Sequence, residues 1–531
     1  MHFAVYIKMV LLRQLCNIDY KLNFRIDVLG GTAMVLGIDL GTTYSACAYI
    51  DMNGEPQIAI NGESQRLTPS VVFFDEDDQI IVGEVAKENG ALFANDVISK
   101  VKIDMGRRKV FKTINEVEYT PEVISSLIIK KIVQDASASI GDEIKDVVIT
   151  VPAYFMDSQR KATEDAAILA GVNLLTIIDE PTAAAIYYKH KSKMDNAKLL
   201  IYDFGGGTFD ATLMEVQNDK IRIIEKDGLS RAGGTMFDQF LVDHVCNYFE
   251  EKHGIDLEDE EYLSEYNELF HKVESCKRQL SAREKAIINM KIDKIKEQIE
   301  ITRPFFESKI EGTYNKTENV IKKILRNSGL QADQIDKVIL VGGSSKIPYV
   351  SKRLTELFGK EPSKEINPDE AVAMGAALYG EIYQQDSSKD ISVFQDVCSH
   401  SIGILVFVDN MHQENQIIIP RMSQIPCTME QVFYTKINDQ RQINVNITEG
   451  EYKEPEFIAL IGDYLIDLPV GLPMNTEIIV KISLDDRQLI HLSIAVPSVN
   501  LEKEFEMKRN ANLDEKEIKK LQGIVSQKTI I

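Results

Sequence analysis

The sequence contains the stretch GIDLGTT at residues 37–43 and the related stretch YDFGGGT at residues 202–208, and this pair decides the fold. Each stretch follows an apolar run with strand character and then places an Asp, a tight Gly turn and hydroxyl groups together. Glycine lets backbone N–H groups approach phosphate oxygens, and a carboxylate can hold a hydrated magnesium ion. The repeat therefore predicts two related half-domains whose hairpins close on one nucleoside triphosphate from opposite sides.

The length and charge of the chain limit its class. Its 531 residues allow roughly three or four domains, and a hydrophobic fraction of 44% suffices for ordinary globular cores. The formal net charge is −22, which argues against a nucleic-acid or anionic-membrane partner, because phosphate backbones attract basic surfaces. We interpret this charge as serving solubility.

The cysteines and the apolar runs point to a cytoplasmic location. The six cysteines are scattered, without a CxxC pair or a Cys/His cluster, so the pattern predicts neither a disulfide framework nor a zinc site. No run approaches the roughly 20 apolar residues that a transmembrane helix requires.

Residues 1–33 differ from the rest of the chain. The segment carries Lys8 and Arg13 but has no clean apolar core and no small-residue cleavage site, so it does not resemble a signal peptide. We expect it to be a non-native or disordered extension, with Met34 as the natural start; the alternative is a genuine strand-forming extension.

Residues 34–385 alternate strand and helix patterns, which is typical of an α/β domain. The pattern predicts strands at 146–151 and 338–341, and helices at 158–170, 181–190, 258–279 and 368–378.

The pattern changes at a polar segment near residues 386–390, and we take 386–397 as a linker with an apolar centre. Short alternating runs at 432–434, 443–447, 477–484 and 491–496 predict an antiparallel β domain over 398–504. The remaining residues, 505–531, contain one short helical pattern at 513–524.

An ordered set of motifs makes the chain similar to the seventy-kilodalton heat-shock chaperones, the DnaK-like proteins. A lone DxGTT is weak evidence, because sugar kinases and actin share it, whereas the whole set is specific and spans Met34 to the end. The motifs are GIDLGTTYS (37–45), VPAYF (151–155), DSQR (157–160), DEPTAAAI (179–186), DFGGGTFD (203–210), VILVGGSSKIP (338–348) and INPDEAVAMGAAL (366–378).

The resemblance implies an α/β, two-lobed ATPase domain of the actin and sugar-kinase type, followed by an antiparallel β-sandwich and a short C-terminal helix. It implies an ATP-dependent chaperone that binds and releases extended apolar peptides, with ATP or ADP and Mg²⁺ as cofactors. It also implies a J-domain co-chaperone and a nucleotide-exchange factor as partners.

The resemblance assigns roles at the phosphate end of the nucleotide. Lys102 is placed near the γ-phosphate and the attacking water, with Lys100 as the alternative if the alignment shifts by two residues. Asp39 and Asp203 are placed at the magnesium ion, through water. The other implied catalytic residues are Glu180, Thr208 and Asp210. The implied nucleotide-binding residues of the glycine turns and their neighbours are Gly41, Thr42, Thr43, Tyr44, Gly205, Gly206, Gly207, Thr208, Gly233 and Gly234.

The residues expected at the adenosine end of the nucleotide come from a different segment. Residues Glu274, Lys277, Arg278 and Ser281 have helical spacing on one face, which alone indicates only a charged helix surface. The resemblance makes them adenine and ribose contacts, with Gly342, Gly343, Ser344, Lys346 and Asp369 on the other side of the purine.

Two positions depart from the family near the nucleotide. Lys346 stands where the family more often has Arg, and Lys stacks less well on a planar base, so we expect weaker nucleotide affinity. Thr235 stands where the family usually has an acid after the Gly pair, which puts a contact near the phosphates in doubt.

For the β domain, the resemblance implies a peptide pocket that draws on Ile404, Phe433 and Ile443; the alternative for each is ordinary sandwich core. Phe407 and Lys436 fall at positions where the family has smaller or neutral residues, and a cation there would disfavour basic peptides. The family's long helical lid is expected to be truncated, so that bound peptide leaves quickly.

Communication between the domains is assigned to Arg160, Val393 and Phe394; the alternative for Arg160 is a surface helix arginine. The linker has Ser392 and Gln395 where the family prefers Leu, and each lost Leu would cost ~1.5–3 kcal/mol of docking energy if fully buried. We therefore expect looser coupling between ATP state and peptide release.

Two other functions remain open at this point. One is a nucleotide-switched regulatory protein that binds a single client without general folding activity. The other is a sugar or acetate kinase, which shares the hairpins but does not account for the residues after 390.

Overall fold

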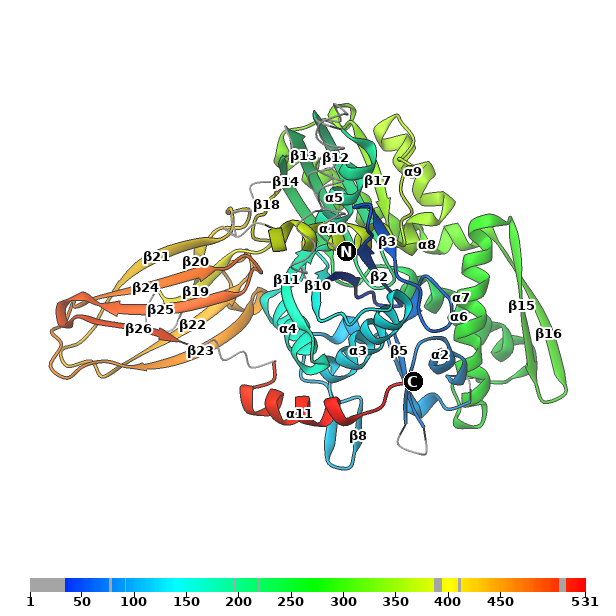
Figure 1. Cartoon of the computed structure of the whole chain (residues 1–531), viewed down its shortest axis with the longest axis horizontal. Coiled ribbons are helices and arrows are strands. Elements are labelled where there is room, and N and C mark those ends of the chain that lie inside the picture. Colours follow the sequence, from blue (N-terminus) through cyan, green and yellow to red (C-terminus); the bar gives the residue numbers. More distant parts are fainter. Residues whose placement is uncertain are drawn as a thin grey trace, which may run out of the picture. The chain divides into compact units, whose positions relative to one another are not determined.

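Both glycine-turn segments form β-hairpins in a computed structural model of the chain (Figure 1). The structure describes residues 34–75, 79–90, 92–194, 196–217, 220–385, 394–408, 412–505 and 512–531. The predicted extension at 1–33 and the linker residues 386–393, Val393 among them, lie outside these ranges.

The first hairpin belongs to a sheet with strand order β11-β10-β1-β2-β3, to which β4 adds through β2. In it β1 pairs antiparallel with β2 and parallel with β10. The predicted strand at 146–151 is confirmed as β10, which is almost wholly buried, as expected of a parallel strand with continuous apolar sequence. The strands are β1 (Val35–Asp39), β2 (Tyr44–Ile50), β3 (Pro56–Ile58), β4 (Thr68–Pro69), β10 (Asp146–Val151) and β11 (Asn173–Asp179).

The second hairpin lies in a sheet with strand order β17-β12-β13-β14-β18. Here β12 pairs antiparallel with β13 and parallel with β17, so the hairpin-plus-parallel-strand arrangement of the first sheet recurs. This recurrence explains the sequence repeat. The strands are β12 (Asn196–Phe204), β13 (Phe209–Gln217), β14 (Lys220–Leu229), β17 (Lys337–Val341) and β18 (Phe394–Gln395).

Helices pack on both sheets, and α10 contacts β1, β2 and α5. Gly375 permits the α10–α5 approach, because a Cβ atom there would stand 1.7 Å from the Ala183 carbonyl oxygen. The main helices are α3 (Pro121–Ile140), α4 (Asp157–Ala170), α5 (Glu180–Ser192), α6 (Gly234–His253), α7 (Leu263–Ala282), α8 (Arg303–Ser328), α9 (Pro348–Phe358) and α10 (Ala371–Gln385).

Two predicted helix starts are wrong. The helix expected from Pro368 begins at Ala371, because the Asn367 side chain accepts a hydrogen bond from the Asp369 N–H and holds a turn there. The acidic helix expected from Glu258 begins at Leu263, after a short 3-10 turn at Glu260–Tyr262.

Smaller elements complete this part of the chain. They are α2 (Glu84–Asn89), β5 (Val71–Phe74), β6 (Ile80–Val82), β7 (Val97–Ser99), β8 (Lys112–Ile114), β9 (Val117–Tyr119), β15 (Lys285–Ile292) and β16 (Ile295–Thr302), with 3-10 turns at Ala94–Asp96, Val101–Asp104, Ala332–Gln334 and Gly343–Lys346. None of the helices in the described ranges is both long and apolar enough to cross a membrane.

Two four-stranded antiparallel sheets follow, with orders β20-β19-β22-β23 and β21-β24-β25-β26, around one shared apolar cluster. The predicted alternating runs are confirmed as strands β21, β22, β24 and β25. The strands are β19 (Ile402–Phe407), β20 (Gln413–Ile419), β21 (Cys427–Tyr434), β22 (Gln442–Glu449), β23 (Ala459–Asp467), β24 (Glu477–Leu484), β25 (Ile490–Val496) and β26 (Leu501–Phe505), with 3-10 turns at Pro455–Phe457 and Pro497–Val499.

The predicted C-terminal helix is confirmed as α11 (Glu515–Gln527), drawn in red in Figure 1. Asp514 caps its N-terminus in a capping box with Glu517. The helix packs on α4, where the Gln522 side-chain amide donates to the Ile168 carbonyl at 2.9 Å. After it, Ile531 exchanges backbone hydrogen bonds with Ile80 and Val82 of β6.

Candidate nucleotide-binding site

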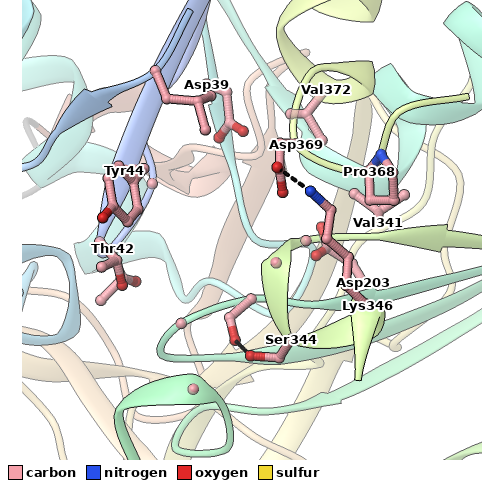
Figure 2. A pocket seen from close by; sticks show the side chains of 18 of the residues that line it. Asp39, Thr42, Tyr44, Asp203, Val341, Ser344, Lys346, Pro368, Asp369 and Val372 are labelled. Atoms are coloured by element: carbon pink, nitrogen blue, oxygen red, sulfur yellow. Dashed lines mark hydrogen bonds and ion pairs between the residues drawn. The ribbon is translucent and has the colours of Figure 1, made fainter. Parts of the chain in front are cut away.

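A cavity of about 300 Å³ lies between the two hairpins (Figure 2). Its lining includes residues of both glycine turns, of α7 and of the turn after β17. The predicted site residues that line it are Asp39, Gly41, Thr42, Thr43, Tyr44, Lys102, Glu180, Asp203, Gly205, Gly206, Thr208, Gly234, Glu274, Lys277, Arg278, Ser281, Gly342, Gly343, Ser344, Lys346 and Asp369.

Some predicted residues lie off this wall. Asp210 is buried behind it and accepts a hydrogen bond from the Tyr154 backbone N–H at 3.0 Å. Gly207 and Gly233 belong to the supporting backbone, where the Gly207 carbonyl accepts from the Ala232 N–H at 3.0 Å. Of the two alternative lysines, Lys102 lines the cavity and Lys100 does not.

The apolar residues that line the cavity were not predicted from the sequence. They are Ala46, Leu67, Val341, Ile347, Pro368 and Val372. Their side chains carry no chemical signal that separates a cavity wall from ordinary core, so only the fold identifies them.

The turn after β17 approaches the second hairpin closely at Gly342. This residue has a φ of +78°, and a Cβ atom there would stand 2.6 Å from the Phe204 carbonyl oxygen. Beside it, the Ser344 hydroxyl donates to the Gly205 carbonyl at 2.7 Å. The two segments are therefore held together at the cavity by glycine and hydroxyl chemistry.

Near the C-terminal ends of β1 and β12, carboxyl groups outnumber cationic groups. Lys102 and Glu180 form a buried ion pair with each other. Burial, followed by the charge of Glu180, raises the pKa of Asp39 to about 7 and that of Asp210 to about 8. The same two causes raise the pKa of Asp203 well above its ordinary value. One lysine thus faces a cluster of carboxyl groups whose charged forms are disfavoured.

This donor set fits a hydrated divalent cation. Oxygen ligands suit Mg²⁺, which usually retains several waters, and its charge would restore the ionised carboxylates. Within the described residues no group of three or more His, Cys, Asp or Glu side chains could ligate a metal directly. The carboxyl groups of Asp39 and Asp203 both line the cavity, where they could contribute oxygen atoms to such an ion.

A polar network closes the α7 side of the cavity. The Lys87 ammonium of α2 donates to Glu274 Oε2 and to the Tyr44 hydroxyl, both at 2.6 Å. Arg278 also reaches the Tyr44 hydroxyl, at 3.1 Å. Lys87 does not itself line this cavity, but it holds two residues that do. It was not singled out from the sequence, because its neighbours in the chain carry no motif.

The remaining charged wall residues are also paired. Lys277 donates to the Gly234 carbonyl at 3.0 Å and to Asp238 at 2.8 Å. Lys346 forms an ion pair with Asp369 across the cavity mouth (Figure 2).

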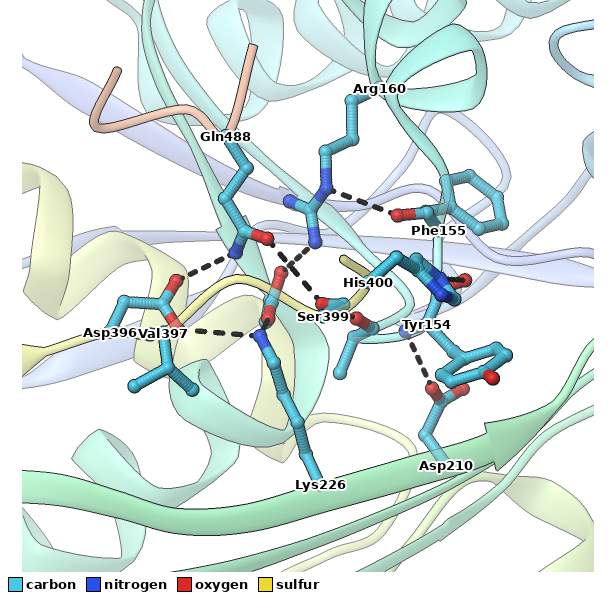
Figure 3. A network of polar contacts seen from close by, with 12 residues as sticks. Tyr154, Phe155, Arg160, Asp210, Lys226, Asp396, Val397, Ser399, His400 and Gln488 are labelled. Atoms are coloured by element: carbon cyan, nitrogen blue, oxygen red, sulfur yellow. Dashed lines mark hydrogen bonds and ion pairs between the residues drawn. The ribbon is translucent and has the colours of Figure 1, made fainter. Parts of the chain in front are cut away.

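Arg160 is buried, so its alternative reading as a surface arginine is wrong. It pairs with Asp179 at 2.7 Å, and Asp179 also accepts from the Lys226 ammonium at 2.9 Å (Figure 3). Lys226 reaches Asp396 at 3.4 Å, and Asp396 accepts from the Gln488 amide at 2.9 Å. A continuous chain of charged groups thus runs from α4 to the segment before β19, and the neutral amide of Gln488 extends it to the β24–β25 turn.

A second set of contacts joins Asp210 to the sandwich. The Tyr154 N–H donates to Asp210, and the Tyr154 carbonyl accepts from His400 Nε2 at 3.1 Å (Figure 3). The hydroxyl of Ser399 donates to the Ala153 carbonyl. At a neighbouring position the Asp157 carboxylate accepts from the Ile490 N–H at 3.0 Å. Of the other predicted coupling residues, Phe394 lies in β18, paired in parallel with β14.

The predicted peptide-pocket residues lie in or against the sandwich core. Ile404 is buried in the shared apolar cluster, and Phe433 and Ile443 are partly buried against it. The two positions flagged as unusual, Phe407 and Lys436, touch each other, with the ammonium 5.7 Å from the ring centroid.

Comparison with known proteins agrees with these features. A family profile described as "Hsp70 protein" matches residues 35–529, including the segment after 390 that a sugar or acetate kinase would not account for. Chaperone protein DnaK of Thermosipho melanesiensis is 36% identical over 498 residues, which cover 92% of this chain and 82% of the relative. Chaperone protein DnaK of Thermotoga neapolitana and of Thermotoga petrophila are each 36% identical over 499 residues, with the same coverage. The chain therefore belongs to the Hsp70 family, whose members are ATPases that act as ATP-dependent molecular chaperones.

Proposed function

We propose that this chain binds ATP in the cavity between the two hairpins and hydrolyses it there, so that the nucleotide controls binding of extended apolar peptides by the sandwich. The observation that carries the proposal is the convergence of both glycine turns and the buried Lys102–Glu180 pair on one cavity. In this layout residues 34–385 form the ATPase domain, 386–397 the linker, 398–504 the peptide-binding sandwich and 505–531 the tail.

The residues around the cavity would lower the barrier mainly by positioning and by charge neutralisation. Lys102 supplies positive charge where negative charge spreads over the γ-phosphate oxygens, and Glu180 fixes the orientation of its ammonium. The Thr208 hydroxyl, on the cavity wall, orients the attacking water. Asp210 lies behind the wall and acts as a positioning residue through the Tyr154 backbone.

Asp39 and Asp203 would hold Mg²⁺ through water, and the ion would supply further positive charge at the phosphates when bound. On the opposite side, Tyr44, Glu274, Lys277, Arg278 and Ser281 would bind the nucleoside with Gly342, Gly343, Ser344, Lys346 and Asp369.

Partners follow from the same proposal. The sandwich would bind unfolded or extended peptide segments by main-chain hydrogen bonds and side-chain pockets that include Ile404, Phe433 and Ile443. A J-domain protein would stimulate hydrolysis and an exchange factor would release ADP, in the cytoplasm. We propose neither a nucleic-acid nor a membrane partner, in line with the net charge of −22.

ATP turnover by the purified chain, with and without an unfolded peptide, tests this function. We expect Lys102→Ala to reduce turnover by roughly 10²–10³-fold, as for loss of a preorganised electrostatic group. Lys109→Ala, in the same loop but exposed, is the matched control. Turnover by Lys102→Ala at the wild-type rate would refute the proposed site.

A second candidate is a nucleotide-switched regulatory protein with one client. It is favoured by the linker, where polar Gln395 occupies β18 beside Arg222 of β14 and provides little apolar docking area. Stimulation of turnover by unrelated unfolded peptides supports the general chaperone, whereas insensitivity to them supports the single-client switch.

A further inference from the structure

A second cavity, of about 270 Å³, lies beside the nucleotide cavity. Its volume is several times the roughly 30 Å³ that one water occupies in the liquid. The two cavities share Thr42, Thr43 and Glu274, so they meet at the first glycine turn. Helices α2, α6 and α7 supply much of the remaining wall, and no residue of the second hairpin lines it.

Lys100 places an ammonium in this second cavity. Its backbone is left-handed, with φ 59° and ψ 25°, a conformation that is uncommon for a residue with a side chain. Its Nζ atom lies 5.0 Å from the centroid of the Phe270 ring. Among the described residues, its ammonium group forms no ion pair and no hydrogen bond. Burial lowers the pKa of Lys100, and the charge of Asp238 partly opposes this effect.

The other charges at this cavity are already matched. Lys87 pairs with Glu274 at 2.6 Å, and Asp238 pairs with Lys277 of the nucleotide cavity at 2.8 Å. Among the described residues that line this cavity, Lys100 is therefore the lysine that forms no ion pair. The neighbouring wall position Thr235 contributes a hydroxyl and no carboxylate.

We propose that the second cavity binds inorganic phosphate, with Lys100 as its principal cation and the Thr42, Thr43 and Thr235 hydroxyls as hydrogen-bond donors. A partly buried ammonium that forms no direct ion pair gains most from an anionic partner that also accepts several hydrogen bonds. The proposal rests on the proposed ATPase function for the origin of the phosphate as the product of hydrolysis, which would enter past Thr42 and Thr43. Phosphate from solution is the other source of the same ligand.

Calorimetric titration of inorganic phosphate into the full chain, saturated with magnesium and a β,γ-imido analogue of ATP, tests this site. The analogue fills the γ-phosphate position, so any saturable phosphate binding must occur elsewhere. We expect Lys100→Gly to weaken phosphate binding by roughly tenfold or more, as for loss of a hydrogen bond to a charged group. Glycine accepts the left-handed backbone without strain, so the fold should persist.

Lys193→Gly is the matched control, because Lys193 is also left-handed, with φ 53°, but is exposed at the end of α5. Thr235→Glu is an independent second variant, which keeps Lys100 but adds a carboxylate and should also weaken phosphate binding. The inference would be overturned if the wild-type chain bound the analogue to saturation but did not bind phosphate. It would also be overturned if wild type and Lys100→Gly bound phosphate equally tightly. Failure of the analogue itself to bind would instead refute the proposed function.

A single-turnover experiment distinguishes the two sources. The amount of ADP formed is measured in samples quenched at set times, and the release of free phosphate is measured with a fluorescent phosphate sensor. If the site receives product, wild type shows a lag between ADP formation and free phosphate, and Lys100→Gly shortens the lag without changing ADP formation. Weakened equilibrium binding with an unchanged lag assigns the site to phosphate from solution.

Discussion

The imidazole of His400 packs edge-on against the ring of Tyr154, with centroids 4.2 Å apart, and donates to the carbonyl of that same residue. Tyr154 in turn holds Asp210 through its backbone N–H. Two residues thus connect the first segment of the sandwich to a carboxyl group behind the nucleotide cavity.

The stability of this contact should depend on pH. Burial lowers the pKa of His400 from 6.5 to about 4; Lys226 and Arg160 act in the same direction, and Glu451 opposes them. The unfolded state therefore binds more protons between pH 6.5 and 4, and stability falls as the pH drops through this window. We expect wild type to lose up to about 3 kcal/mol of unfolding free energy relative to His400→Leu. Urea unfolding from pH 7 to 4 measures this, with exposed His412→Leu as the control; parallel curves for wild type and His400→Leu would contradict it.

Removing one member of the buried chain of ion pairs formed by Arg160, Asp179, Lys226 and Asp396 should lower the free energy of unfolding. Lys226 is 1% exposed and Asp179 is 1% exposed, so Lys226→Met leaves Asp179 with Arg160 alone in a buried setting. We expect a loss of about 3–5 kcal/mol of unfolding free energy, together with weaker peptide stimulation of turnover. Lys364→Met removes a lysine from an exposed pair and should change stability by less than about 1 kcal/mol. Equal effects of the two substitutions would count against the network.

The acidic cluster should destabilise the metal-free protein at high pH. Because burial raises the pKa of Asp210 to about 8, the folded state keeps a proton that the unfolded state loses above about pH 4. Wild type should therefore lose stability relative to Asp210→Asn as the pH rises from 4 to 8, by up to about 5 kcal/mol. Denaturation in the presence of a chelator measures this, with exposed Asp333→Asn as the control. A pH-independent difference would refute the assignment.

Nucleotide affinity should rise on Lys346→Arg. The guanidinium can pair with Asp369 in two-pronged geometry and still lie flat against a base, whereas the ammonium is used by Asp369 alone. We expect ADP to bind about two- to fivefold more tightly, on the scale of a weak cation–π contact. Calorimetric titration checks this against Lys352→Arg, an exposed lysine on α9; unchanged affinity would count against the stacking argument.

Peptide charge preference should depend on Lys436. Its ammonium lies over the exposed Phe407 ring, so it adds positive charge to that face of the sandwich. Lys436→Glu should strengthen binding of basic peptides several-fold at low salt, and the gain should shrink as salt increases. Fluorescence anisotropy with a basic and an acidic peptide tests this, with Lys453→Glu as the control. If both peptides respond alike, the effect is not electrostatic.

The two hairpins, two further strands, four strands of the sandwich and five helices were predicted, because their signals are local: glycine turns, apolar periodicity and helix stops. The long helices α3, α6 and α8 were not predicted. The boundary at Ala371 was not predicted either, since the Asn367 side chain competes with the helix start. Lys87 and Lys226 reach their partners through the fold from distant parts of the chain, so no local spacing reveals them. Arg160 could be singled out only by the resemblance, because burial of a helix arginine leaves no trace in its own sequence neighbourhood.

The return of α11 to α4 affects how the sandwich can move. Asp396 contacts Lys226 before the first strand, and after the last strand the Asn512 side chain donates to the Ser158 carbonyl. The sandwich therefore has a contact with the preceding part of the chain both before its first strand and after its last strand. Movement of the sandwich away from α4 would have to break contacts at both ends, the Asp396–Lys226 pair and the Asn512–Ser158 hydrogen bond.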